Sequence, residues 1–107
     1  MSFGAGHMAK MMKRVQKMQA ELLRVQEEVA SKTVEATAGG GAVRAVVSGR
    51  LELKALEISP EAIDPDDPEL LGDLVMAAVN EALRRAQEMV QKEMARVTGG
   101  LSLPGIF

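Results

Sequence analysis

The stretch that decides the fold is TVEATAGGGAVRAVVSGRLELKALEIS, residues 33–59. Apolar and polar side chains alternate in three runs within it, at residues 33–38, 42–48 and 51–58. Alternation with a period of two predicts strands, and the glycine-containing turns between the runs are typical of hairpins. The stretch therefore predicts a three-stranded antiparallel meander.

In the third run, the apolar side chains switch from one face of the strand to the other. Leu51 and Leu53 fall on one face, whereas Leu56 and Ile58 fall on the other. An extra residue in one strand shifts the parity of all the residues that follow it. We therefore expect a β-bulge near Ala55, or burial of both faces of this strand.

Upstream of the meander, the pattern has a helical period. Apolar residues recur at alternating spacings of three and four, and no proline or glycine interrupts them. Such a heptad seam predicts a helix that packs along another helix, here from Met8 to Ala30. Residues 1–7, which include two glycines, are expected to form a flexible extension. The seam consists of Met8, Met11, Val15, Met18, Leu22, Val25 and Val29.

Downstream of the meander, two proline motifs predict helix starts. Ser59-Pro60-Glu61 and Asp67-Pro68-Glu69 each place an N-cap residue, a proline and an acid in the order that begins a helix. The first predicts one short helical turn, and the second predicts a long helix from Pro68 to Val97. Residues 99–107 are expected to form a C-terminal tail. The apolar stripe of the long helix comprises Met76, Val79, Leu83, Ala86, Val90, Met94 and Val97, widened by Leu71, Val75, Ala78 and Ala82.

These elements define an α+β fold in a single domain, residues 1–107. The order is long helix, three-stranded antiparallel meander, short helical turn and long helix. The sequence contains only two aromatic residues, Phe3 and Phe107, so the core must come from small and aliphatic side chains. Two long apolar seams and an open three-stranded sheet leave surface that a second copy would bury. We therefore expect a homodimer from which pairs of helices protrude.

Several function classes lack the residues they require. The sequence has no cysteine and one histidine, His7, so nucleophilic catalysis has no candidate pair and we expect no enzyme and no cofactor. Gly39-Gly40-Gly41 precedes a strand without the Lys-Ser/Thr of a phosphate loop, which favours a hairpin turn. The six acids of residues 61–73 match no calcium loop, so we assign them to helix N-termini rather than to a metal site. No apolar run is long enough to span a membrane.

The net charge of −2 conceals a row of cations near the N-terminus. Cations at helical spacing on one side of a helix are suited to neutralising DNA phosphates. A solvated face with ion pairs four residues apart, such as Lys17 with Glu21 and Arg24 with Glu28, is the alternative interpretation. Three of the cations have no carboxylate within four residues. The candidate DNA-binding residues are Lys10, Lys13, Arg14, Lys17 and Arg24 on the first helix, and Arg84, Arg85, Lys92 and Arg96 on the last.

The methionines allow a second hypothesis. Most of them fall on the two seams, where packing explains them. A methionine-rich helix face also adapts to varied protein partners, so a helical adaptor that binds another protein is the alternative function. The scarcity of aromatic side chains disfavours base stacking and hence single-stranded nucleic acid as the ligand.

Four segments resemble the YbaB/EbfC family of bacterial nucleoid-associated proteins. They are MMKRVQKMQAELLRVQEEV, VSGRLELKALEIS, LLGDLVMAAVNEALRRAQEMVQKEM and TGGLSLPG. Together they cover nearly the whole chain from Met8. The elements AAVNEAL and TGG…LPG are the most specific, whereas the pattern of the first helix alone is weak.

The resemblance implies a homodimer whose joined sheet carries protruding helix pairs. It also implies binding of duplex DNA with low or variable sequence preference, compaction or bending of the nucleoid in the cytoplasm, and effects on gene expression. By position, the family's DNA-binding surfaces correspond to residues 10–17 and 84–96 of this chain.

Overall fold

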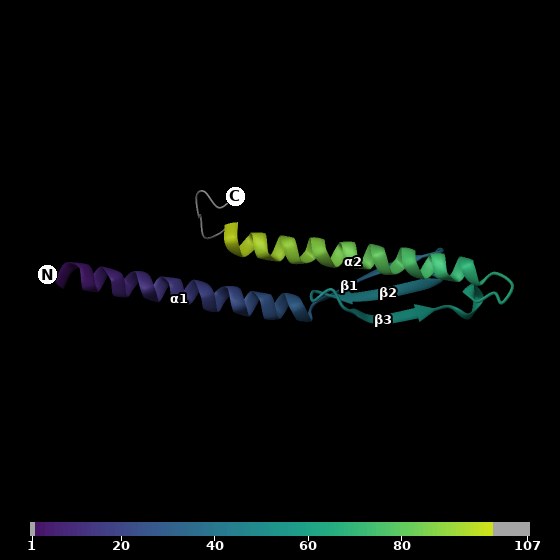
Figure 1. The fold of residues 1–107 in the computed structure, drawn as a ribbon, viewed down its shortest axis with the longest axis horizontal. Coiled ribbons are helices and arrows are strands. Elements are labelled where there is room, and N and C mark those ends of the chain that lie inside the picture. Colours follow the sequence, from purple (N-terminus) through teal and green to yellow (C-terminus); the bar gives the residue numbers. More distant parts are fainter. Residues whose placement is uncertain (1, 100–107) are drawn as a thin grey trace.

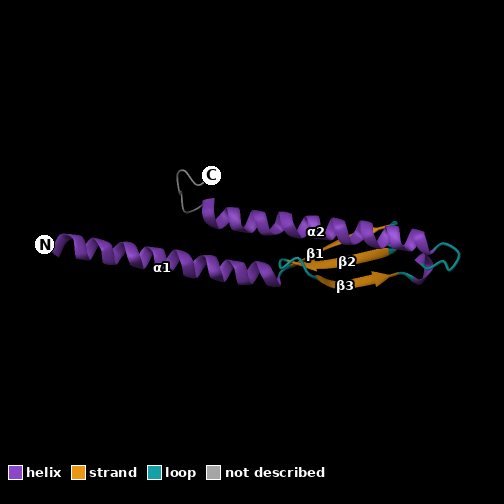
Figure 2. Cartoon of the chain, viewed as in Figure 1, coloured by secondary structure: helices purple, strands orange, loops and turns teal. Residues whose placement is uncertain are grey.

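The chain is an elongated α+β molecule with extents of 82 × 23 × 16 Å. A computed structural model describes residues 2–99, and the side chains of residues 6–97 (Figure 1). A projecting helix precedes the sheet, and a second long helix lies across the sheet and runs back beside the first (Figure 2). The elements are α1 (Ser2–Ser31), β1 (Thr33–Ala38), β2 (Val43–Ser48), β3 (Leu53–Ile58), η1 (Pro60–Ala62) and α2 (Pro68–Gly99).

Helix α1 begins earlier than the sequence pattern predicted. Its first residue is Ser2, so residues 2–7 are helical and the expected flexible extension is corrected. A long helix extends readily, because each further residue adds a hydrogen bond after nucleation. The two glycines in this segment lower helix propensity without preventing extension. The helix ends at Ser31, and only Lys32 separates it from β1.

The predicted antiparallel meander is confirmed, with strand order β1-β2-β3. The bulge is confirmed within one residue of its expected place. Val46 pairs with Ala55 and Val47 pairs with Leu53, so Lys54 is the extra residue in β3. The turn between β1 and β2 uses three glycines in the left-handed region, with φ of 64°, 67° and 95° at Gly39, Gly40 and Gly41. Only glycine adopts three such conformations in succession without steric cost.

The core lies between α2 and the first two strands. The buried residues are mostly small, which lets the helix approach the sheet closely. Helix α2 packs mainly over β1 and β2, and most of β3 is left exposed. Within α2, Ala78 and Ala82, which were expected only to widen the apolar stripe, are buried against the sheet. Met76, a member of the main predicted stripe, is exposed. The buried cluster comprises Ala36, Val43, Ala45, Val47, Ala78, Ala82 and Ala86.

The start of α2 follows the predicted capping. The Leu70 amide donates to Asp67 Oδ1 at 3.2 Å, as expected of an N-cap aspartate. At η1, Ser59 makes no side-chain cap; the Ala62 amide instead donates to its carbonyl at 2.9 Å. Helix α2 continues to Gly99, two residues beyond its predicted end. The remaining part of the predicted tail, residues 100–107, lies outside the described residues.

The junction between α1 and the sheet depends on Gly49. Its amide donates to the Lys32 carbonyl at 2.9 Å, which fixes the turn between β2 and β3 against the end of α1. A Cβ at this position would lie 2.0 Å from the Val29 carbonyl oxygen. No side chain fits there, because the obstacle is helix backbone and not a movable side chain.

Candidate nucleic-acid interface

The four cations at the N-terminal end of α1 form a free row. Each is exposed and, within residues 6–97, none forms an ion pair. At 3.6 residues per turn their spacing of three and four places them on one side of the helix. The first acid in the sequence is Glu21, so no carboxylate precedes or interrupts the row. We call Lys10, Lys13, Arg14 and Lys17 the α1 row.

Arg24 differs from the α1 row because two carboxylates hold it. It forms ion pairs with Glu21 and with Glu28, the latter at 2.6 Å. The hydrogen bond that Arg24 donates to Glu21 raises the pKa of Arg24 above its ordinary value, with charge attraction from both acids adding to it. The expected pair of Arg24 with Glu28 is therefore present. The expected ion pair between Lys17 and Glu21 does not form in the described structure, because Glu21 pairs with Arg24 instead.

The arginines of α2 are also paired with carboxylates. Arg84 contacts Glu81 and, at 2.5 Å, Glu88, and Arg85 contacts Glu81 at 3.2 Å. The hydrogen bond from Arg84 lowers the pKa of Glu81, against an opposing effect of burial. Arg85 is additionally anchored to the sheet, since its Nη1 donates to the Glu35 carbonyl at 2.8 Å. These side chains are therefore less available to a ligand than the α1 row.

The last two candidate residues of α2 differ from each other. Arg96 pairs with Glu93 at 2.8 Å, whereas Lys92 is exposed and forms no ion pair among the described side chains. Glu93 also accepts an ion pair from Lys32 at 3.3 Å, which ties α2 to the end of α1. Sequence reasoning missed this link because 61 residues separate the two partners.

Two further arginines lie on and beside the sheet. Arg44 on β2 lies between Glu35 on β1 and Glu57 on β3, and it forms ion pairs with both. Strand register alone creates this triad, so only a predicted pairing scheme would have revealed it. Arg50, in the turn that follows β2, is exposed and has no ion pair within the described side chains. The sequence analysis assigned no role to Arg50, because a single charged residue in a turn is a weak indication of a binding site.

The six acids of residues 61–73 lie at the other end of the molecule from the α1 row. The segment between β3 and α2 lies at the opposite end of the long axis from the N-terminus of α1 (Figure 1). Charges separated by more than about 8 Å are largely screened at physiological salt. The six acids of residues 61–73 therefore do not cancel the positive potential of the row, although they lower the net charge of the chain.

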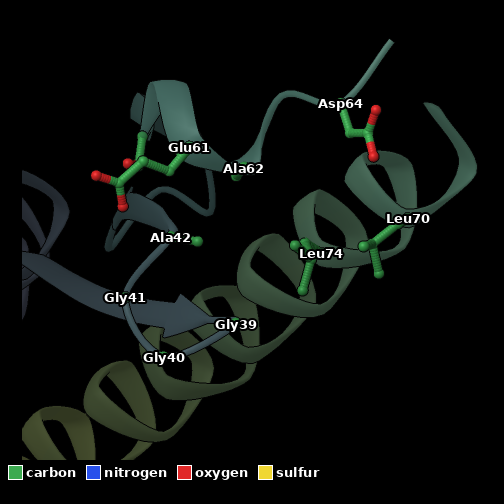
Figure 3. A pocket seen from close by; sticks show the side chains of 10 residues that line it. Gly39, Gly40, Gly41, Ala42, Glu61, Ala62, Asp64, Leu70 and Leu74 are labelled. Atoms are coloured by element: carbon green, nitrogen blue, oxygen red, sulfur yellow. The ribbon is translucent and has the colours of Figure 1, made fainter. Parts of the chain in front are cut away.

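The only histidine and the glycine turn make no catalytic arrangement. His7 is exposed on the first turns of α1. A pocket of about 390 Å³ lies between the glycine turn, η1 and the start of α2 (Figure 3). It is lined by glycines, apolar residues, Ser59 and two acids, Glu61 and Asp64, and by no cation. A phosphate would meet negative charge there, which agrees with the interpretation of Gly39-Gly40-Gly41 as a turn.

Within the described residues, no cluster of three or more histidine, cysteine, aspartate or glutamate side chains is arranged to hold a metal ion. Asp64 and Asp67 instead accept backbone amides, from Asp66 at 2.9 Å and from Leu70 at 3.2 Å. None of the described helices is long and apolar enough to cross a membrane.

A row of unpaired cations on a projecting helix, remote from the six acids of residues 61–73, defines a class of surface suited to a polyanion. Comparison with known proteins gives a more specific result. Residues 4–101 match the YbaB/EbfC DNA-binding family. The chain belongs to this family, as the resemblance of four of its segments to the family indicated.

Two similar proteins are both described as nucleoid-associated proteins. A nucleoid-associated protein of Pelotomaculum thermopropionicum is 59% identical over 102 residues, which cover 95% of this chain and 97% of that protein. One from Thermoanaerobacter pseudethanolicus is 56% identical over 104 residues, covering 97% and 94%. The crystal structure of an uncharacterized Helicobacter pylori protein has the same fold, with a TM-score of 0.66 and 23% identity over 81% of this chain and 90% of that one.

Proposed function

We propose that this protein is a nucleoid-associated protein that binds duplex DNA through the α1 row. Membership of a DNA-binding family and the names of its relatives support the ligand. The observation that carries the assignment of the site is the freedom of the row: four cations on one side of a projecting helix, with no carboxylate partner in the described structure. The relatives give no support to the alternative of a protein adaptor.

The row acts on the DNA backbone. Each lysine or arginine that meets a phosphate releases condensed counterions, and this release supplies sequence-independent affinity. The row extends about 10 Å along the helix axis, enough to follow several phosphates of a duplex. Backbone contact of this kind accounts for low sequence preference, because base edges are not needed for affinity. The role is binding, organisation of the nucleoid and an effect on gene expression, without catalysis.

The other candidate cations contribute less. Lys92 is free to meet a phosphate, whereas Arg24, Arg84, Arg85 and Arg96 must exchange a carboxylate for one. An exchange of partners gains less than a new contact, since the existing ion pair is lost. We therefore rank the α1 row first, Lys92 next and the paired arginines last.

We further propose that the protein acts as a homodimer joined at β3. By strand register, Leu53 and Leu56 lie on the same face as the buried Val47 and Ala45, yet they are 46% and 38% exposed because α2 does not cover them. β3 is also an edge strand, whose free backbone groups can pair with another strand. A second copy that covers this face would bury both leucines and place two α1 rows on one particle.

The dimer is tested by sedimentation of a Leu53→Lys/Leu56→Lys variant. We expect the native chain to sediment as a dimer at micromolar concentration and the variant as a folded monomer. Leu23→Lys, at a residue that is 60% exposed on α1, is the matched control and should remain dimeric. A monomeric native chain would disprove the dimer.

The DNA site is tested by replacing all four residues of the α1 row with alanine. Affinity for a random-sequence duplex should fall, and the plot of log affinity against log salt should become flatter by about 3.6, or 0.9 per lost phosphate contact. Circular dichroism should show unchanged helicity, because alanine favours helix. Unaltered binding would refute the assignment of the site, and no binding by the native chain at low salt would refute the function.

A further inference from the structure

An apolar groove lies on α1, on the side of the helix opposite the cationic row. Its four hydrophobic residues are 51–64% exposed, although they form a continuous surface. The groove measures about 490 Å³. A contiguous apolar surface on a soluble protein usually marks a place where something binds. The groove is lined by Met8, Met11, Met12, Val15, Gln16 and Gln19.

The groove continues the seam by which α1 packs against α2. At the base of α1, Val25 and Val29 are each 3% exposed. Toward the N-terminus the same seam becomes exposed, with Met11 at 52%. Helix α2 runs antiparallel to α1 and stops before the N-terminal half of α1 (Figure 1). The groove is therefore the part of the seam that extends beyond the end of α2.

The chain itself supplies a candidate occupant at this point. The ion pair of Lys32 with Glu93 fixes the register of the two helices. Gly99 is six residues beyond Glu93, so α2 ends level with about residue 26 of α1, roughly 16 Å along the axis from Val15. The sequence continues as GLSLPGIF, residues 100–107. Eight residues span at most about 26–29 Å when fully extended, which is sufficient to enter the groove.

The composition of this segment matches the groove. Half of its residues are large and apolar, and none has a charged side chain: Leu101, Leu103, Ile106 and Phe107. Because it is tethered within reach, its effective concentration at the groove is in the millimolar range, above that of a second molecule in dilute solution. At 3.6 residues per turn, the centre of the groove lies on the opposite side of α1 from the row of cations. Occupation of the groove thus leaves the row exposed.

We propose that residues 100–107 dock in cis into the Met8–Val15 groove of α1, completing the seam that α2 leaves unfinished. The docked segment shields the methionines from solvent and supports the projecting half of α1. This arrangement does not depend on the identity of the DNA-binding residues.

Disulfide trapping tests the docking directly, because the chain has no native cysteine. A Val15→Cys/Leu103→Cys variant should form an intramolecular disulfide, which requires the two Cα atoms to approach within about 7 Å. Ala20→Cys/Leu103→Cys is the matched control, since Ala20 is exposed, nearer to the end of α2 and on another side of α1. We expect trapping in the first variant to be about tenfold faster. Equal rates, or disulfides only between two chains, would overturn docking in cis.

Methionine oxidation by hydrogen peroxide gives a second readout. Met11 and Met76 are similarly exposed in the described structure, at 52% and 57%. If the tail covers the groove, Met11 oxidises several times more slowly than Met76 in the full chain. A variant with serine at all four large apolar residues of the tail should raise the Met11 rate to that of Met76, without changing Met76. Equal rates in the native chain, or protection of Met11 that survives in the variant, would overturn the proposal.

Discussion

The two long helices carry the same four-position pattern with different residues. On α1 the pattern is Lys10, Lys13, Arg14 and Lys17, and on α2 the same spacing holds Glu81, Arg84, Arg85 and Glu88. The middle two positions are cationic in both. The outer positions are lysines on α1 and glutamates on α2, where they bind the arginines between them.

The difference shows that a count of cations does not define an anion-binding surface. A carboxylate three or four residues away on the same side of a helix reaches the cation first. The α2 arginines therefore already have partners, while the α1 cations depend on solvent or a ligand. Two outer residues decide between the two outcomes, so exchanging them converts one pattern into the other.

The largest effect is expected from moving the α2 pattern onto α1. Lys10→Glu/Lys17→Glu removes two phosphate contacts and gives Lys13 and Arg14 carboxylate partners. Loss of four contacts corresponds to about a thousandfold weaker duplex binding at 0.1 M salt. Fluorescence anisotropy across a salt series measures the change. Arg50→Glu, at an exposed residue away from the row and outside β3, carries half of this change in net charge, and a loss half as large on the logarithmic scale would show that net charge governs binding.

A structural change at the base of α1 should have the next largest effect. Gly49→Ala introduces a Cβ into the Val29 carbonyl oxygen, so either α1 or the turn between β2 and β3 must move. Such overpacking costs about 1–3 kcal/mol of unfolding free energy. Urea denaturation measures the loss. Gly72→Ala, in α2 with open space around its Cβ, is the control for an added methyl group and should not destabilise the fold; a Gly49→Ala variant as stable as the native chain would contradict the close approach.

The reverse exchange should have a smaller effect. Glu81→Lys/Glu88→Lys reproduces the α1 pattern on α2 and frees Arg84 and Arg85 from their carboxylates. If this face lies near the bound duplex, affinity rises by about tenfold. Glu81→Gln/Glu88→Gln separates the release of the arginines from the added lysines. Binding that stays constant in both variants would place the α2 face away from the DNA.

The smallest effect concerns pH. Arg84 lowers the pKa of Glu81 below its ordinary value of 4.5. This ion pair thus stabilises the fold above the pKa of the unfolded carboxyl group, and its contribution is lost as pH falls through the lower value of the folded state. The loss is small because the pair is exposed to solvent. Urea midpoints measured below pH 4.5 should decline less steeply for Glu81→Gln than for the native chain, and identical slopes would argue against the pair.

The sequence predicted the elements of the fold well, because local patterns determine them. The alternation of residues 33–58, the glycine turns and the Asp67 cap are short-range signals, and each leads to the structure observed. Even the bulge was detectable, since one extra residue reverses the parity of β3. The start of α1 was wrong because propensity at Gly4 and Gly6 is a weak signal beside the extension of an existing helix.

The sequence could not show which part of each seam has a partner. The heptad pattern of α1 is uniform from Met8 to Val29, yet only its last two turns are buried, because α2 ends too early to cover the rest. Similarly, spacing placed Glu21 within reach of both Lys17 and Arg24. The bidentate geometry of arginine toward carboxylates favours Arg24, which leaves Lys17 in the row. Partner choice depends on competition in three dimensions, which a one-dimensional pattern does not contain.

The junction at Gly49 gives the molecule the mechanics of a lever. A single residue connects α1 to the sheet, and the hydrogen bond from Gly49 to Lys32 holds that residue at the fulcrum. The arm of 30 residues is about 45 Å long, so a rotation of about 5° at the fulcrum moves its tip by about 4 Å. That displacement is comparable to the axial step of about 3.4 Å between neighbouring phosphates on one DNA strand. The α1 row lies about 22–33 Å along the arm from Lys32, so the same rotation moves its cations by about 2–3 Å, most of one such step.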